Sequence, residues 1–176
     1  MKDIDFDTRA IALKNKMIEL NIAEPNLVSG CSKEEIEKLE QDNNVIFPKS
    51  YRVFLEYFGH GLGGTVMSDI NILYEDIQGL TDRLRNEVLI YEGDPILPEN
   101  AFVFATRFEE QFMFFDVSSS QDEPPILYYM ENHESFSQVG KSIFDILEKE
   151  IEGWYQLKME SEERKRNRNN RQISGV

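Results

Sequence analysis

Residues 31–64 constrain the fold most, because they specify two short helices separated by a proline and followed by a glycine-rich exit. Ser32 and Glu35 have the spacing of a capping box, in which each side chain accepts a hydrogen bond from a backbone N–H in the first turn of a helix. Pro48 is favoured at the first position of the second helix. That helix is predicted to bury a stripe of side chains made by Tyr51, Phe54, Leu55 and Phe58.

The remaining elements are predicted by periodicity and by turn residues. In chain order they are a helix over 5–22, short strands or one broken hairpin over 65–67 and 70–74, a helix within 75–90 and a loop over 91–100. Strands follow over 101–106, 111–117 and 126–130, with a turn at Glu109 and Glu110 between the first two, and a last helix begins after Ser142. Short connections between strands favour an antiparallel meander, and the apolar runs suggest burial on both faces over part of its length. Residues 164–176 are expected to be disordered.

This order of elements predicts an α+β fold, in which helices pack against an antiparallel β-sheet. A length of 176 residues is typical of one domain. The core should be rich in aromatic side chains, because the chain contains 12 Phe and 7 Tyr.

The composition also bears on possible partners. The formal charge is −14, from 33 acidic and 19 basic residues. An excess of this kind repels nucleic acid and anionic membranes and favours a basic protein partner, although it also serves solubility. We therefore expect neither nucleic acid nor a membrane as partner, and no pattern specifies an oligomeric state.

Cysteine content and hydropathy favour a cytoplasmic protein. Cys31 is the single cysteine, which excludes an intramolecular disulfide and argues against a cysteine-based metal site. No apolar run approaches the ~20 residues of a membrane span. The acidic residues 1–7 lack the apolar centre of a signal peptide.

The sequence predicts no catalytic residue, metal ligand or cofactor, and therefore no enzyme. The glycines of residues 59–64 follow a helix and lack the Lys and Ser/Thr of a phosphate-binding loop, so a turn leading into the sheet is favoured. His60 and His133 lack the spacing of metal ligands. Adjacent carboxylates such as Glu109 and Glu110 point in different directions and make no catalytic pair.

The order of motifs over residues 31–152 resembles the SUKH superfamily, which includes fungal cell-wall regulators of the Smi/Knr type and many bacterial toxin-immunity proteins. The capped acidic helix and Phe47-Pro48 carry the resemblance, together with Phe115-Asp116 and the helix opening at Ser142. The chain departs from the pattern at 107–110, where many members have a glycine-rich turn. The resemblance divides the chain into an N-terminal helical extension (1–26), a SUKH-like domain (27–157) and a charged, basic C-terminal tail (158–176).

The resemblance implies an immunity protein that neutralises a cognate toxin, a nuclease or another nucleic-acid-targeting enzyme, by stoichiometric occlusion. Acidic loop residues would pair with Lys and Arg of the toxin, and exposed tyrosines would anchor it. The expected toxin-binding residues are Asp69, Tyr74, Glu75, Asp76, Tyr91, Glu92, Asp94, Glu109 and Glu110. The alternative is a regulatory scaffold, a protein-interaction module related to the cell-wall regulators. A third possibility, an enzyme acting on a small cationic or metal-bound substrate, has no supporting residue constellation.

Overall fold

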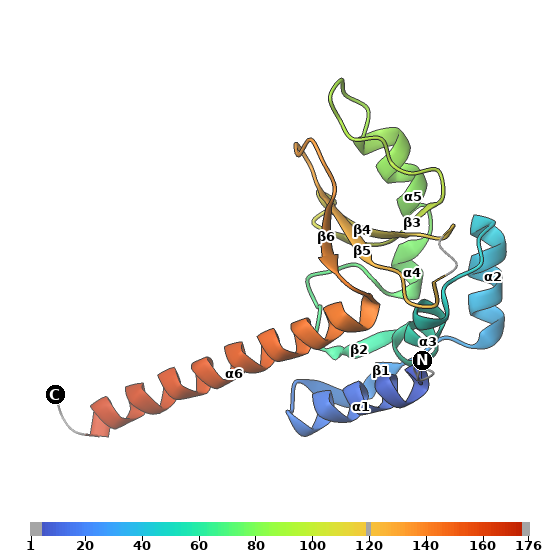
Figure 1. Cartoon of the computed structure of the whole chain (residues 1–176). Helices are drawn as coiled ribbons and strands as arrows, with labels where there is room; N and C mark the ends of the chain where they lie inside the picture. Colours follow the sequence, from blue (N-terminus) through green and yellow to red (C-terminus); the bar gives the residue numbers. More distant parts are fainter. Residues whose placement is uncertain (1–4, 119–120, 174–176) are drawn as a thin grey trace.

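The computed structural model describes residues 5–118 and 121–173. It confirms the predicted α+β class, with helices packed on antiparallel sheets of two and four strands (Figure 1). The elements are α1 (Phe6–Glu19), β1 (Ala23–Ser29), α2 (Lys33–Asn43), α3 (Lys49–Phe58), β2 (Gly61–Gly64), α4 (Tyr74–Ile77), α5 (Leu80–Arg83), the π-helical turn η1 (Leu84–Val88), β3 (Ala101–Arg107), β4 (Gln111–Asp116), β5 (Ile126–Met130), β6 (Ser137–Gly140) and α6 (Ile143–Ile173).

The predicted helix caps are present. Ser32 Oγ accepts from the Glu35 N–H at 3.2 Å, and the Glu35 carboxylate accepts from the Ser32 N–H at 2.8 Å, which completes the capping box of α2. Ser142 Oγ likewise accepts from the Asp145 N–H at 3.1 Å at the start of α6. The prediction for α3 was wrong by one residue, because Pro48 is the extended N-cap and Lys49 begins the helix.

The four-stranded sheet is an antiparallel meander in the order β3-β4-β5-β6. Three of its strands were predicted, and the fourth, β6, was not. The sequence of β6, Ser-Gln-Val-Gly, carries no alternation of apolar and polar residues. The strands predicted over 65–67 and 70–74 were wrong, because these residues form turns with a single bridge between Asn71 and Thr106.

The two-stranded sheet was also missed. The exit from α3 was predicted to be a turn, whereas Gly61–Gly64 form strand β2 and pair with β1. Pro25 lies within β1, where a missing N–H is tolerated because the strand has only one neighbour. A four-residue strand with three glycines and a strand containing proline both lack the signals by which strands are recognised in a sequence.

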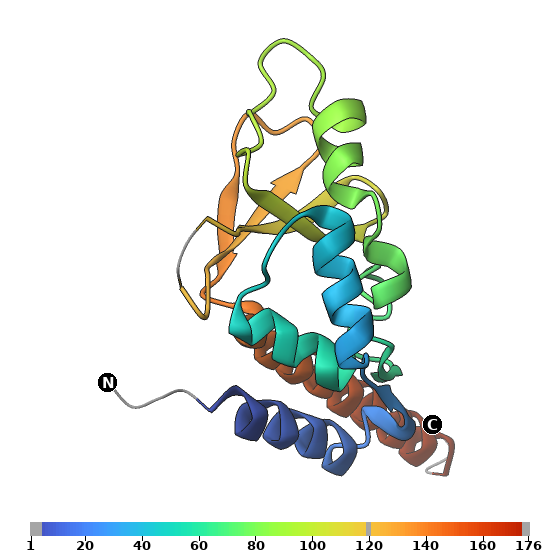
Figure 2. The same ribbon diagram turned by 90° about the vertical axis from the view of Figure 1, so that its right-hand side faces the viewer.

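Two apolar clusters lie on opposite faces of the four-stranded sheet. The larger cluster joins α1, α2, α3 and α6 to one face, and the smaller cluster lies under α5 and η1 on the other (Figure 2). Strand β3 is consequently buried on both faces, as its continuous apolar run predicted: Phe102 and Phe104 belong to the first cluster, and Ala101 and Val103 to the second.

The expected disorder after residue 164 was wrong as far as the structure describes the chain. Helix α6 continues to Ile173 and projects beyond the rest of the protein (Figure 1), while residues 174–176 lie outside the described part. Glu160 and Arg164 pair at 3.2 Å one turn apart on this projection. Such pairs stabilise an exposed helix by about 0.2–0.5 kcal/mol each. Among the residues described, no helix combines the length and apolar character of a membrane span.

Candidate functional site

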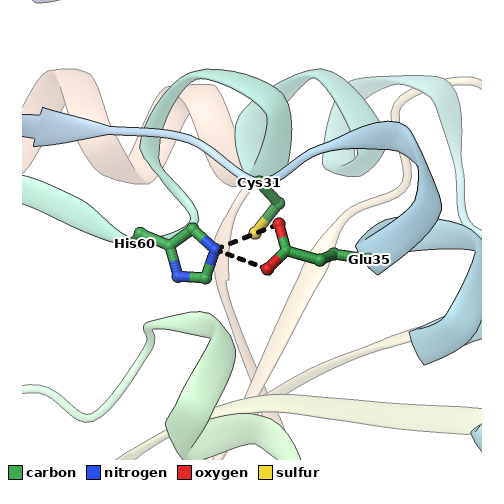
Figure 3. Close-up of side chains that lie close together, drawn as sticks. All are labelled: Cys31, Glu35 and His60. Atoms are coloured by element: carbon green, nitrogen blue, oxygen red, sulfur yellow. Dashed lines mark hydrogen bonds and ion pairs between the residues drawn. The ribbon is translucent and has the colours of Figure 1, made fainter.

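Cys31, Glu35 and His60 converge at the junction of three segments (Figure 3). Cys31 lies between β1 and α2, Glu35 lies in the first turn of α2, and His60 connects α3 to β2. One potential ligand atom from each residue lies within 4.8 Å of the other two. The thiol and the imidazole both point toward the Glu35 carboxylate.

The His60 ring lies between two carboxylates. Its Nε2 is 3.1 Å from Glu35 Oε1, and its Nδ1 is 2.7 Å from Glu75 Oε1 at the start of α4. The Tyr74 ring packs edge-on against the imidazole at a centroid distance of 5.3 Å. These contacts hold the imidazole in one orientation and join α2 to α4.

The Cys31 side chain is buried and closely surrounded by backbone, so only a small side chain fits at this position. Cys31 is 7% exposed, and its backbone N–H donates to Leu55 O at 2.8 Å. A Cβ added to Gly59 would lie 2.3 Å from Cys31 Sγ, so glycine is required beside the sulfur. Within the described residues, the thiol makes no hydrogen bond, and it faces the Glu35–His60 pair.

The ionisable groups of this cluster shift one another's pKa values. Burial lowers the pKa of His60, but the hydrogen bonds that its ring makes to the Glu35 and Glu75 carboxylates outweigh this effect and raise that pKa above its ordinary value. The hydrogen bond from the Ser32 N–H, followed by the one from His60, lowers the pKa of Glu35. Burial, with smaller contributions from Glu35 and Glu75, raises the pKa of Cys31 to about 12. The surroundings therefore favour a protonated His60 beside an ionised Glu35, and they keep Cys31 a neutral thiol.

The raised pKa of His60 predicts a loss of stability as pH rises. A group whose pKa is higher in the folded state stabilises the fold below its unfolded pKa, and this contribution disappears above the folded pKa. With no metal bound, we expect the free energy of unfolding to fall by about 0.5–1 kcal/mol between pH 6 and 8 as His60 loses its proton. This magnitude is typical of partly exposed ion pairs. Urea denaturation at both pH values should show this loss in the wild type and a smaller one in His60→Gln. His133→Gln is the matched control, and an equal loss in His60→Gln would contradict the assignment.

The nine residues predicted to bind a toxin fall into three separate groups. Tyr74, Glu75 and Asp76 lie in α4, Asp69 lies in the turn before it, and all four are largely engaged within the fold. Asp69 pairs with Arg107 at 2.5 Å, and Asp76 accepts from the Leu73 N–H at 3.2 Å. Because their charges already have internal partners, these residues offer little unpaired negative potential.

The second group lies in the turn between β3 and β4. Glu109 pairs with Arg83 of α5 at 2.8 Å, and the hydrogen bond that Arg83 donates, together with its charge, lowers the pKa of the Glu109 carboxyl. Glu110 is exposed, and its side chain forms no salt bridge to the residues that the structure describes. This turn was predicted correctly, but it contributes one available carboxylate instead of two.

The third group lies in the segment between η1 and β3, hereafter the 90–96 loop. This loop protrudes from the end of the molecule opposite α1 (Figures 1 and 2). Tyr91 is 73% exposed, and Ile90 and Ile96, which the sequence analysis did not select, are 56% and 92% exposed. The signal that could have identified these isoleucines was their position in a Gly- and Pro-containing loop, because large apolar side chains in such a loop are candidates for binding a partner.

The base of the 90–96 loop is fixed and borders a polar cleft. Arg85 donates to the carbonyl oxygens of Pro98 and Glu99 at 3.1 and 3.2 Å, which ties the end of the loop to η1. The adjacent cleft has a volume of about 510 Å³, and its lining includes the carboxylates of Asp42, Asp82 and Glu99. The apolar residues of the 90–96 loop and the carboxylates of the adjacent cleft can therefore contact the same partner.

One protein-family model matches most of the chain. A model of the SUKH_6 family, described as SMI1-KNR4 cell-wall, matches residues 33–147. The matched region includes Glu35, His60 and the 90–96 loop, and it excludes Cys31, α1 and the projecting part of α6. A search of the curated proteins finds no match.

Proposed function

We propose, from the premise that this chain belongs to the SMI1-KNR4 family of the SUKH superfamily, that it is an immunity protein that binds and neutralises a cognate toxin. The observation that carries this proposal is the protruding 90–96 loop, which combines three exposed large apolar side chains with acidic neighbours. The toxin is a basic protein that acts on nucleic acid, and inhibition occurs by stoichiometric occlusion without a reaction on this chain.

The loop has the composition of an anchoring element. A few residues supply most of the binding energy of an interface, and aromatic side chains are enriched among them. Tyr91 offers such a ring, and Ile90 and Ile96 extend the apolar surface around it. Because these side chains are already exposed in the free protein, the partner has no core contact to displace.

The charge distribution suits a basic partner. Glu92 is exposed beside Tyr91, and Glu99 lies where the loop meets the acidic cleft. With a net charge of −14, the whole chain also accelerates the encounter with a cationic protein. Carboxylates that meet the Lys and Arg side chains of a nuclease would occupy the positions of nucleic-acid phosphates, which blocks the substrate.

The test begins with a candidate toxin domain encoded next to the gene for this protein. Its nuclease activity is measured against rising amounts of the purified chain. The proposal predicts that activity falls to baseline near a one-to-one ratio, and that the affinity weakens with added salt. Full toxin activity in the presence of excess chain would contradict it.

Substitutions in the loop test which surface binds. Tyr91→Ala combined with Ile96→Ser is expected to weaken binding by at least roughly 30-fold, which corresponds to a hot spot of about 2 kcal/mol. Ile11→Ser is the matched control, because Ile11 is an exposed aliphatic residue on α1 at the opposite end of the molecule. Equal affinities for wild type and loop variant would move the interface away from the 90–96 loop.

The words "cell-wall" in the family description favour a second candidate function, a regulatory scaffold. A scaffold would use the same loop to bind proteins of its own cell, with no toxin involved. Capture from a lysate of the producing cell separates the two functions. A single basic toxin domain favours immunity, whereas several endogenous proteins favour the scaffold.

A further inference from the structure

We propose that Cys31, Glu35 and His60 form a binding site for Zn²⁺ or a chemically similar divalent transition metal. This inference goes beyond the proposed function and does not depend on it. Thiolate, imidazole and carboxylate are the three side-chain types that bind zinc in proteins, and all three are present here. The fourth position of a tetrahedral ion would be open to water.

The distances are compatible with one ion. Atoms bound to the same tetrahedral zinc at ~2.0–2.3 Å lie about 3.3–3.6 Å from one another. Glu35 Oε1 and His60 Nε2 are already 3.1 Å apart. Because the full set lies within 4.8 Å, the Cys31 sulfur would need to approach by at most about 1.3 Å.

The surroundings supply the outer contacts that zinc sites use. A zinc-bound histidine almost always donates its other ring N–H to a carboxylate or carbonyl, which fixes its orientation. Glu75 Oε1 lies 2.7 Å from His60 Nδ1 and leaves Nε2 to face the metal. Glu35 can keep its capping contact to the Ser32 N–H through Oε2 while Oε1 binds the ion.

The buried thiol is an independent observation that points to a ligand. Cys31 is 7% exposed and directs its sulfur at the Glu35–His60 pair, yet no hydrogen bond to it is found among the described residues. A side chain that served only to fill the core would not need to face two ionisable groups. A metal ion between these groups would give the sulfur a partner.

Binding of the ion has to displace protons, because zinc is held by a thiolate and by an unprotonated imidazole nitrogen. The ion would take the place of the proton on the Cys31 sulfur and of a proton on His60 Nε2, between the same three side chains.

The experiment uses the full chain, stripped of metal with a chelator and titrated with Co²⁺ as a spectroscopic substitute for Zn²⁺. The wild type should bind one ion and show a near-ultraviolet sulfur-to-cobalt charge-transfer band, which added Zn²⁺ abolishes. Cys31→Ser should remove the band and lower the affinity at least tenfold. Glu75→Gln should lower the affinity about tenfold with the band retained, because Glu75 orients a ligand without binding the ion.

His133→Gln is the control, because it removes the only other histidine of the sequence. Circular dichroism establishes that each variant is folded, and Glu35→Gln provides a test at a partly exposed position if Cys31→Ser does not fold. An absent band in the wild type at saturating Co²⁺, or an unchanged affinity in folded Cys31→Ser or Glu35→Gln, would overturn the proposal.

Discussion

Replacing Tyr51 with alanine is expected to lower the free energy of unfolding by about 3–5 kcal/mol, the range for removal of a large aromatic from a core. Tyr51 is 1% exposed and lies where α3 meets the four-stranded sheet. Its ring is 5.0 Å from that of Phe47, 5.1 Å from that of Phe115 and 5.5 Å from that of Phe104. Alanine would leave a cavity between helix α3 and strands β3 and β4, which rigid secondary structure cannot close.

Tyr51→Phe is expected to change the free energy of unfolding in the opposite direction from Tyr51→Ala. The Tyr51 hydroxyl is buried and has no hydrogen-bond partner within the described residues, and burial raises its pKa well above 10. An unsatisfied buried hydroxyl costs about 1–3 kcal/mol, so its removal should leave stability unchanged or increase it by about 1 kcal/mol. Urea denaturation followed by circular dichroism measures both variants. A loss of 2 kcal/mol in Tyr51→Phe would show that the hydroxyl has a partner.

The predictable part of the fold was the part determined by neighbouring residues. The capping box of Ser32 and Glu35 depends on residues three positions apart, so the sequence alone locates the start of α2. Strands β3, β4 and β5 were recognised because each is a run of apolar, β-prone residues, which is a local signal. Strand β6 escaped recognition because it is formed by pairing with β5, which no local pattern in its four residues reveals.

The candidate metal cluster depends entirely on tertiary structure. Cys31 and His60 are 29 positions apart in the sequence and have no ligand motif between them, which is why spacing argued against a metal site. They meet because the chain before α2 crosses the end of α3, where the Cys31 N–H donates to Leu55 O. The carboxylates expected to bind a toxin were selected by their charge and loop position, and neither could distinguish carboxylates paired with Arg83 or Arg107 from available ones.

Gly30→Ala is expected to destabilise the protein by at least about 3 kcal/mol, at the upper end of the cost of overpacking. A Cβ at this position would lie 1.7 Å from Glu56 O and 2.3 Å from Glu56 C, both backbone atoms of α3. No side-chain rotation relieves this contact, so either α3 or the segment before α2 must move. Since the same crossing holds Cys31 against Leu55 O, the shift should also displace the thiol from Glu35 and His60.

Gly153→Ala is the matched control for this substitution. A Cβ on Gly153 meets no atom within 4 Å, and the residue lies inside α6. Alanine there should stabilise the protein by about 0.5–1 kcal/mol, because it restricts the unfolded chain and favours the helix. Thermal and urea denaturation of both variants measure the expected loss of stability in Gly30→Ala and the expected gain in Gly153→Ala. If Gly30→Ala were as stable as wild type, residue 30 could not lie as close to the backbone of α3 as described here. The path of the chain that brings Cys31 to His60 would then have to be different.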